Sequence, residues 1–322
     1  MNCLIINLQY FLHGLVNFSP YPVGKHNENG DQAMSIRRIT DNQSQPQVNS
    51  GSLLKHSFNA LWLSDIHLGS KDCKAEYLLQ FLRQTHTDSL YLVGDIIDIW
   101  AMKRRVYWPE SHNQVLQQLL IMAKNGTKII YVPGNHDEPF KAYVGFNLWD
   151  VSIAKEHIHT TLGGHKILML HGDQFDSQVC VGKALTRLGD RLYDLLLVLN
   201  RLLHRIRTHL GYPYWSLASY IKLRVNKAQQ AIGLFRAAVV SYAQDQEVDG
   251  VICGHIHQPE LSQQGKLFYA NDGDWVENCT FIAESDRGEL QLHKWDEQTN
   301  TSFVTASISL NNKCKSLKQQ VA

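Results

Sequence analysis

The chain has 322 residues, of which 44% are hydrophobic and 19% are charged, and its formal net charge is +1. These fractions are those of an ordinary globular protein, and a net charge this small indicates no particular partner for the chain as a whole. Six cysteines occur without a C-x-x-C pair, and no run of 18 apolar residues is present. The sequence therefore indicates neither a disulfide framework, nor a thiolate zinc site, nor a transmembrane helix, and a reducing cytoplasmic setting is expected.

The first 55 residues are expected to lie outside the folded domain. Residues 24–52 are rich in Asn, Gln, Ser and Gly, a composition typical of disorder. The stretch before them lacks a basic n-region and a small-residue cleavage site, so no signal peptide is expected. We interpret residues 1–55 as a disordered extension, or as the product of a start codon placed too early, with Met34 as the true start.

Strands and helices then alternate, and strands predominate toward the C-terminus. Short apolar runs that end at glycine or polar residues predict strands, and apolar residues at three- and four-residue spacing predict helices. The predicted elements are strand 58–64, helix 75–84, strand 90–93, helix 114–124, and strands 128–132, 165–170, 248–253, 267–270, 280–284 and 289–295. This order predicts an α/β sandwich with its helices on the outside. Its parts are a folded domain (56–174 and 246–296), a helical insertion (175–245) and a flexible tail (297–322).

Polar residues that can bind metal ions follow directly after five of the predicted strands. The clusters are Asp65-x-His67, Gly94-Asp95-x-x-Asp98, Gly134-Asn135-His136-Asp137, His171-Gly172-Asp173 and Gly254-His255-x-His257. Open α/β sheets place their sites at the carboxyl ends of strands, and residues i and i+2 of an extended backbone project to the same side. Any one pair is a common chance pattern, but five in order predict a metal centre. Carboxylate, imidazole and amide ligands without thiolate suit Mn²⁺, Fe²⁺ or Zn²⁺.

The order of these motifs resembles the calcineurin-like metallophosphoesterase superfamily over about residues 58–295. The resemblance implies an α/β fold in which two β-sheets are flanked by α-helices, with a helical cap inserted, and a centre of two divalent ions. Mn²⁺ is the expected metal, with Fe²⁺ or Zn²⁺ as alternatives. The ligands implied for one ion are Asp65, His67, Asp95 and His257, and those for the other are Asp95, Asn135, His171 and His255.

The resemblance also implies roles for residues beside the ions. A hydroxide between the ions would attack phosphorus in line with the leaving group. His136 would donate to the leaving oxygen, and Asp98 would orient His136. Asp137 and Asp173 are expected to have structural roles.

The predicted insertion combines a leucine stripe with positive charge. Apolar residues, mostly leucine, recur at three- and four-residue steps from Leu185 to Leu210, and ten Lys or Arg stand against three Asp between Asp176 and Arg236. This pattern fits a packed cap whose arginines face water. It also fits a basic, apolar cap that handles an anionic amphiphile at an anionic membrane surface. Basic and aromatic residues suit single-stranded nucleic acid as well, but the stripe is more apolar than such a channel needs, so nucleic acid is not expected.

Longer strings are similar to one branch of the superfamily, the UDP-2,3-diacylglucosamine diphosphatase-like proteins of Gram-negative bacteria. The strings are Trp62–Gly69, Tyr91–Asp98, Tyr131–Asp137, His171–Asp176 and Asn271–Trp275. This resemblance implies hydrolysis of the pyrophosphate of a UDP-linked diacylated sugar to UMP and a lipid sugar 1-phosphate, a step of lipid A synthesis. It implies a cytoplasmic protein that contacts the inner face of the inner membrane, and Lys222, Arg224 and Lys227 are candidate phosphate contacts.

Two positions depart from that branch and follow the general phosphoesterase pattern instead. His136 stands where the diphosphatases carry Arg, and Asp98 stands where they carry another acidic residue. The chain is therefore interpreted as a divergent member, and hydrolysis of other soluble nucleotides or phosphoesters is the alternative. Ile99-Trp100 replaces the Arg-Gly of protein phosphatases, which argues against a phosphoprotein substrate. A retired scaffold or a nuclease is a further alternative, although no position of the expected ligand set is missing.

Overall fold

The computed structural model describes residues 56–148, 151–179, 199–207, 209–210, 216–217 and 226–310, all within one compact unit, Gly51–Ala322. Three expectations lie outside the described residues: the extension 1–55, the greater part of the insertion, and the last residues of the tail from 311. Within the described parts of the chain, no helix is long and apolar enough to span a membrane.

The larger of the two sheets has eight strands in the order β13-β12-β11-β1-β2-β3-β5-β4. Strands β1, β2, β3 and β5 run parallel, so their carboxyl ends share one edge of the sheet, and β11, β12 and β13 add antiparallel strands beside β1. Their bounds are β1 His56–Leu63, β2 Thr85–Val93, β3 Lys128–Val132, β4 Asn147–Leu148, β5 Val151–Ile153, β11 Thr280–Glu284, β12 Glu289–Asp296 and β13 Thr301–Ser309.

The second sheet has five strands in the order β6-β7-β8-β10-β9. Its three central strands are parallel, and the two outer strands are antiparallel to their neighbours. The bounds are β6 His157–Thr160, β7 Lys166–Met169, β8 Gly250–Cys253, β9 Glu260–Gln264 and β10 Leu267–Asn271.

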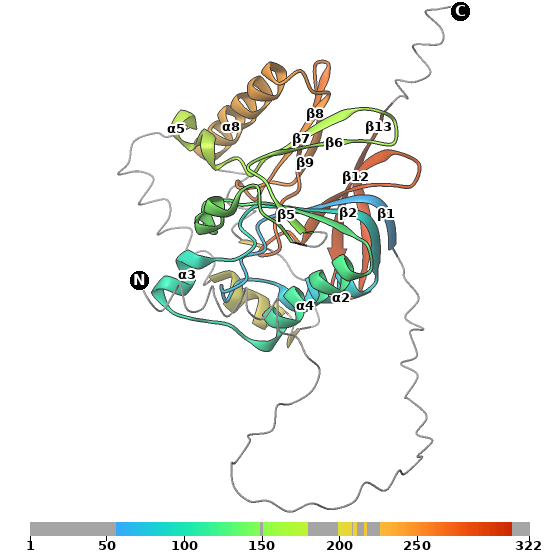
Figure 1. Cartoon of the computed structure of the whole chain (residues 1–322). Coiled ribbons are helices and arrows are strands. Elements are labelled where there is room, and N and C mark those ends of the chain that lie inside the picture. Colours follow the sequence, from blue (N-terminus) through green and yellow to red (C-terminus); the bar gives the residue numbers. More distant parts are fainter. Residues whose placement is uncertain are drawn as a thin grey trace, which may run out of the picture. The chain divides into compact units, whose positions relative to one another are not determined.

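Helices cover the outer faces of the sheets. Figure 1 shows α2 and α4 side by side near the larger sheet, with α8 and α5 on the side of the smaller one. The helices are α2 Ala75–Arg83, α3 Ile99–Arg104, α4 Glu110–Lys124, η1 Glu138–Tyr143, η2 Asp173–Phe175, α5 Asp176–Val179 and α8 Asn226–Asp245. Residues 199–207 are also helical.

The two-residue period of the strands divides the core into layers. On β7, Ile167 and Met169 belong to the apolar cluster that also contains inward-facing residues of the larger sheet. Leu168, between them, faces the other way and packs with Phe235 and Val239 of α8. The smaller sheet is thus buried on both faces, which explains why its central strands read as continuous apolar runs.

These observations confirm the predicted α/β fold with two sheets and outer helices. The strand predictions for 128–132 and 280–284 match β3 and β11 at both ends, whereas β2 begins five residues before the predicted start. Five strands were not predicted: β4, β5, β6, β9 and β13. The first four are short or carry no alternating apolar pattern.

Two predicted boundaries need correction. Within the tail expected to be flexible from residue 297, Thr301–Ser309 instead forms β13, which pairs with β12. Helix α8 was assigned to the insertion, but its residues Phe235, Val239 and Ala243, spaced four apart, pack on the smaller sheet. The second half of α8 therefore belongs to the core of the sandwich.

Candidate metal centre

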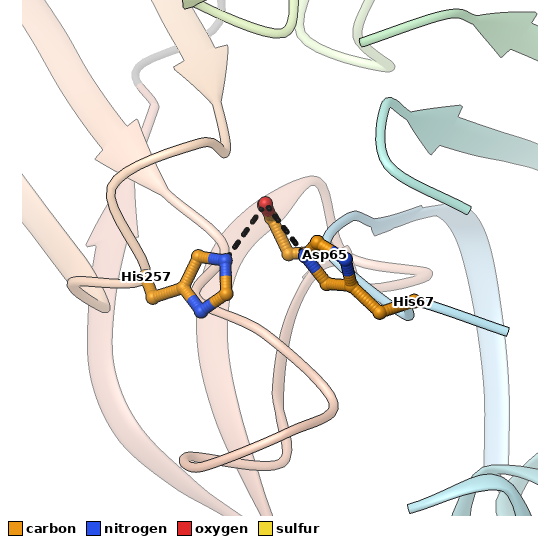
Figure 2. A group of neighbouring side chains, drawn as sticks. All are labelled: Asp65, His67 and His257. Carbon is orange, nitrogen blue, oxygen red and sulfur yellow. Dashed lines mark ion pairs between the residues drawn. The ribbon is translucent and has the colours of Figure 1, made fainter. Parts of the chain in front are cut away.

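Three side chains from two strand ends converge to form the first candidate group. Asp65 and His67 follow β1, and His257 follows β8. Asp65 Oδ1 lies 3.1 Å from His257 Nε2 and 3.9 Å from His67 Nε2. Figure 2 shows the carboxylate between the two imidazole rings.

Two atoms of this group are buried without a hydrogen bond. They are Asp65 Oδ1 and His67 Nε2, whereas the other polar atoms of the same side chains are bonded. His67 Nδ1 donates to Asp98 Oδ2 at 3.1 Å, so Nε2 is the nitrogen that carries the lone pair when the ring is neutral, as it is in a metal ligand. Buried polar atoms are normally satisfied, so a carboxylate oxygen and an imidazole nitrogen left facing one another fit a divalent cation.

The second candidate group consists of Asp95, His171 and His255, which follow β2, β7 and β8. His171 Nδ1 donates to the Val93 carbonyl at 2.9 Å, so Nε2 faces the group and lies 3.4 Å from Asp95 Oδ2. Asn135 Oδ1 lies 3.3 Å from the same nitrogen.

Asp95 connects the two groups. Its Oδ2 lies 3.4 Å from His171 Nε2 in the second group and 3.9 Å from His67 Nε2 in the first. Its other oxygen, Oδ1, accepts a hydrogen bond of 2.8 Å from the backbone amide of His136. The carboxylate is thereby held in the position that a bridging ligand needs.

The backbone at these turns is strained. Five of the eight non-glycine residues with positive φ in the described chain belong to the two groups: Asp65, His67, Asp95, His255 and His257. Left-handed backbone costs about 1–2 kcal/mol for a residue with a side chain. Strain concentrated at one site indicates that the fold holds these residues in place for a function and not for stability.

Two glycines allow the backbone to approach His171 and Asp95 closely. A Cβ on Gly94, whose φ is +88°, would lie 2.1 Å from His171 Nδ1. A Cβ on Gly134 would lie 2.3 Å from Asp95 Oδ1. The turns can thus pack directly against His171 and Asp95 of the second group only because these positions lack a side chain.

A third cluster lies beside the first group and contains His67, Asp98 and His136. Asp98 uses one oxygen for each histidine: Oδ2 is 3.1 Å from His67 Nδ1, and Oδ1 is 2.9 Å from His136 Nδ1. Asp98 Oδ1 also accepts from the Ala101 amide at 2.7 Å and so caps α3. The indole of Trp100 packs against the His136 ring, with 4.4 Å between ring centroids.

The electrostatics of the site favour ionised carboxylates. Burial alone would raise the pKa of Asp65, but His257 outweighs it and lowers that pKa to about 2. Burial likewise opposes ionisation of Asp98, and its hydrogen bonds from His136 and His67 hold its pKa well below the usual range. Burial lowers the pKa of His67, but hydrogen bonding to Asp98 and the nearby carboxylates raise it to about 9. The carboxylates are thus ionised, and they stabilise positive charge on the neighbouring histidine His67.

Several supporting residues were not predicted from the sequence. The Ser64 hydroxyl lies 2.5 Å from Asp65 Oδ2 and 2.6 Å from Asp272 Oδ1, and Asp176 Oδ1 lies 2.6 Å from His255 Nε2. The partners are separated by 208 residues for Ser64–Asp272 and by 79 for His255–Asp176, so no local motif marks them. The strings Trp62–Gly69, His171–Asp176 and Asn271–Trp275 contain these residues, but they assign no supporting role to them.

The remaining predicted residues are placed as follows. Asp137 is buried and accepts from the Ile96 amide at 2.8 Å and the Gly134 amide at 2.5 Å, so it closes the turn, whereas Asp173 pairs with Lys141 at 2.6 Å. The three candidate substrate contacts are not placed. Lys222 and Arg224 lie outside the described residues, and of Lys227 only the backbone, in α8, is described.

Comparison with known proteins identifies the family. The family model described as "Calcineurin-like phosphoesterase" matches residues 58–259. A curated relative named UDP-2,3-diacylglucosamine hydrolase, from Psychromonas ingrahamii, is 27% identical over 72% of this chain and 95% of its own. Proteins of the same name from Chromohalobacter salexigens and Aliivibrio fischeri are 26% and 23% identical, over 63% and 73% of this chain and 81% and 97% of their own lengths.

Proposed function

The chain belongs to the calcineurin-like phosphoesterase family and is a metal-dependent phosphoester hydrolase, and on this premise we propose that it cleaves the pyrophosphate of a UDP-linked diacylated sugar. The products would be UMP and a lipid sugar 1-phosphate. The observation that carries the proposal is the pair of adjacent ligand groups joined by Asp95, an arrangement suited to two ions that act together on one phosphoryl group. The names of the curated relatives support the choice of substrate.

We assign the ligands as the motifs suggest. One ion would be held by Asp65, His67, Asp95 and His257, and the other by Asp95, Asn135, His171 and His255. When bound, the ions would withdraw charge from the phosphoryl oxygens and make water a better nucleophile near neutral pH. The buried and unbonded atoms of the first group support this assignment.

His136 is the proposed proton donor to the leaving oxygen. Its side chain is 27% exposed, so it can reach a bound substrate, and Asp98 and Trp100 fix its ring. The Asp98 carboxylate accepts a hydrogen bond from His136 Nδ1, and Nε2 then points toward the ligand groups, 4.0 Å from Asp95 Oδ2. A donor placed this way would protonate the departing phosphate as the bond breaks.

Mn²⁺ is the metal that we propose. Oxygen and imidazole ligands without a thiolate favour Mn²⁺, Fe²⁺ or Zn²⁺, and they disfavour soft metals. Activity of chelated enzyme reloaded with each metal in turn, together with metal analysis of the purified protein, would decide among the three.

The substrate is tested directly with UDP-2,3-diacylglucosamine. Wild-type enzyme loaded with Mn²⁺ should release UMP, and Asp95→Asn should not, because that substitution affects both groups. The matched control is Asp88→Asn, which alters an exposed aspartate far from the groups. No release of UMP under any of the three metals would refute the substrate, although hydrolysis of bis(4-nitrophenyl) phosphate would then still show a phosphodiesterase.

Hydrolysis of other soluble nucleotides or phosphoesters is the second candidate. It is favoured by the His136–Asp98 pair, which follows the general phosphoesterase pattern. The two candidates differ in their dependence on the insertion. An enzyme lacking residues 180–225 should keep activity on soluble esters and lose it on the lipid-linked substrate. The deletion ends before α8, because α8 belongs to the core.

The position of the protein in the cell follows from its substrate. We propose a cytoplasmic protein that contacts the anionic inner face of the inner membrane of a Gram-negative bacterium, with Lys222, Arg224 and Lys227 near the substrate phosphates. The excess of positive charge between residues 176 and 236 supports this contact. Binding to vesicles that contain phosphatidylglycerol should weaken as salt rises, and binding unaffected by salt would contradict an electrostatic contact.

A further inference from the structure

A buried asparagine organises the part of the insertion that the structure describes. Asn200 lies in the helical residues 199–207 and is 3% exposed. Its Oδ1 accepts from the Leu217 amide at 2.7 Å, and its Nδ2 donates to Ser216 Oγ at 3.1 Å. One side chain therefore fixes two consecutive residues against this helical segment.

The same serine also forms a hydrogen bond with a residue of the folded domain. Ser216 Oγ donates to Glu277 Oε2 at 2.8 Å, and Glu277 is 2% exposed. A carboxylate this deeply buried is costly unless it is hydrogen bonded. The buried polar chain Asn200–Ser216–Glu277 is thus a specific connection and not an incidental surface contact.

Glu277 stands in a loop that contacts the first candidate group. Within residues 274–278, Asp274 Oδ1 accepts from the Val276 amide at 2.8 Å. Asn278 Nδ2 donates to the His257 carbonyl at 3.2 Å. The Trp275 amide donates to the Asp65 carbonyl at 3.1 Å. The loop therefore holds the backbone of two members of the first group.

A second contact joins the helical segment to the chain just after the turn that carries Asp65 and His67. Arg201, next to Asn200 in sequence, forms an ion pair with Asp72, and Asp72 lies five residues beyond His67. Both of these attachments thus end on segments that carry or contact Asp65, His67 and His257. On the segment itself, Leu202 and Ile206 expose 53% and 48% of their surfaces, and Leu210 just beyond it exposes 63%, which leaves apolar surface for a ligand.

We propose that Ser216 and Glu277 are positioning residues, which fix the helical insertion relative to the first metal group. This inference rests on the proposed function in one respect, since a substrate with a long apolar part would contact the insertion and the ions together. The polar chain sets the distance between these two contacts. Binding of an ion at Asp65, His67 and His257 should in turn steady the helical segment through the same chain.

The coupling can be measured without a substrate. Hydrogen exchange of the amides in 199–207 should slow about fivefold or more when Mn²⁺ is added to chelated wild-type protein. In Ser216→Ala this slowing should vanish, while amides near residues 64–67 still respond to Mn²⁺. Ser216→Thr keeps the hydroxyl and should restore the coupling, and Ser307→Ala, on the exposed face of β13, should behave as wild type. Equal slowing at 199–207 in wild type and Ser216→Ala, or no slowing in wild type, would overturn the proposal.

Activity gives the second measurement. For Ser216→Ala, KM for UDP-2,3-diacylglucosamine should rise about tenfold, with kcat/KM for bis(4-nitrophenyl) phosphate within about twofold of wild type and two ions bound. An equal loss on both substrates would indicate a general structural defect and refute a positioning role. If wild type fails to cleave the lipid-linked substrate, the proposed function fails, and the exchange experiment still decides whether the chain couples the insertion to the metal group.

Discussion

Asp98 Oδ1 lies 2.9 Å from His136 Nδ1, so the carboxylate that caps the N-terminus of α3 also orients the partly exposed histidine beside the candidate metal groups. Its second oxygen bonds His67 at 3.1 Å. A single carboxylate thus serves two histidines for which we propose different roles, a proton donor and a metal ligand. Substitutions can separate these roles.

His136→Ala should lower kcat by about 10²–10⁴-fold, because a positioned general acid contributes that much to phosphate transfer. It should retain two ions, since His136 belongs to neither ligand group that we assign. Rates on UDP-2,3-diacylglucosamine and metal content by mass spectrometry check both statements. The control is His86→Ala, an exposed histidine in β2. A His136→Ala enzyme with two ions and the full rate would refute the role of the donor.

Asp98→Asn should lower both rate and metal affinity. An amide offers one acceptor atom and one donor atom, so it can keep the hydrogen bond to only one of His136 and His67. Loss of such a supporting contact typically weakens metal binding about 10–100-fold. Competition with a fluorescent chelator measures the affinity. If Asp98→Asn lost rate but bound both ions as tightly as wild type, the contact between Asp98 and His67 would not contribute to metal affinity.

The close packing of Gly134 against Asp95 gives a prediction about backbone. Gly134→Ala places a Cβ 2.3 Å from Asp95 Oδ1 and 2.7 Å from the His171 ring, so second-group binding should weaken at least about tenfold. Gly233→Ala is the matched control, because nothing lies within 4 Å of its Cβ position in α8. That control should stabilise the helix by about 0.5–1 kcal/mol. Calorimetric titration with Mn²⁺ compares the two, and unchanged binding in Gly134→Ala would contradict this account of the turn.

The two candidate ligand groups could be predicted from the sequence because each proposed ligand follows a recognisable strand. Asp65 and His67 lie within four residues of the end of β1, and the same holds for Asp95 after β2 and for His255 and His257 after β8. A strand's end can be read from a local apolar run, and parallel pairing then brings the ends together. The order of the parallel strands therefore implied that these residues lie close together in space, and no long-range side-chain contact had to be predicted.

The supporting contacts and the attachment of the insertion could not be predicted in this way. Ser216 and Glu277 are 61 residues apart, and neither lies in a periodic pattern. Strand β13 was missed because its apolar residues are only partly buried: Phe303 and Val304 are about half exposed, although the backbone pairs with β12. Polar networks and edge strands depend on which segments meet, and only the folded structure supplies that information.

His293, on β12, makes stability depend on pH far from the metal centre. It is 6% exposed and stacks on Phe281 with 4.9 Å between centroids. Burial, with a smaller effect from His56, lowers its pKa from 6.5 to about 4. Between these values the unfolded chain takes up a proton that the folded chain excludes, so stability falls as pH drops from about 6.5 to 4, by up to about 3 kcal/mol.

His293→Gln should remove this acid-side loss, because glutamine does not titrate. Urea unfolding at pH 7.5 and pH 4.5 in chelator measures the difference. The variant should lose less stability than wild type between the two pH values, whatever its stability at pH 7.5. His86→Gln, at an exposed histidine, should leave the difference unchanged. If His293→Gln and wild type lost stability equally, the His293 pKa would be normal in the fold.

The number of ions should be readable from thermal stability. Each ion present at about 100 times its dissociation constant adds about 2.7 kcal/mol to the free energy of unfolding, which corresponds to about 5–10 °C in Tm. Wild type should therefore gain the most on addition of Mn²⁺ to chelated protein. His257→Ala removes a member of the first group only, and His255→Ala one of the second only, so each should keep one ion and part of the gain.

Asp95→Asn should abolish most of the gain, because Asp95 lies within 4 Å of a histidine in each group. Scanning calorimetry with metal analysis of the same samples tests the order: wild type first, the two histidine variants next and Asp95→Asn last. Asp88→Asn should match wild type, since it carries the same change of charge at an exposed position. A histidine variant that lost both ions would show that the groups bind as one unit. An Asp95→Asn protein that kept two ions would show that Asp95 does not join the groups.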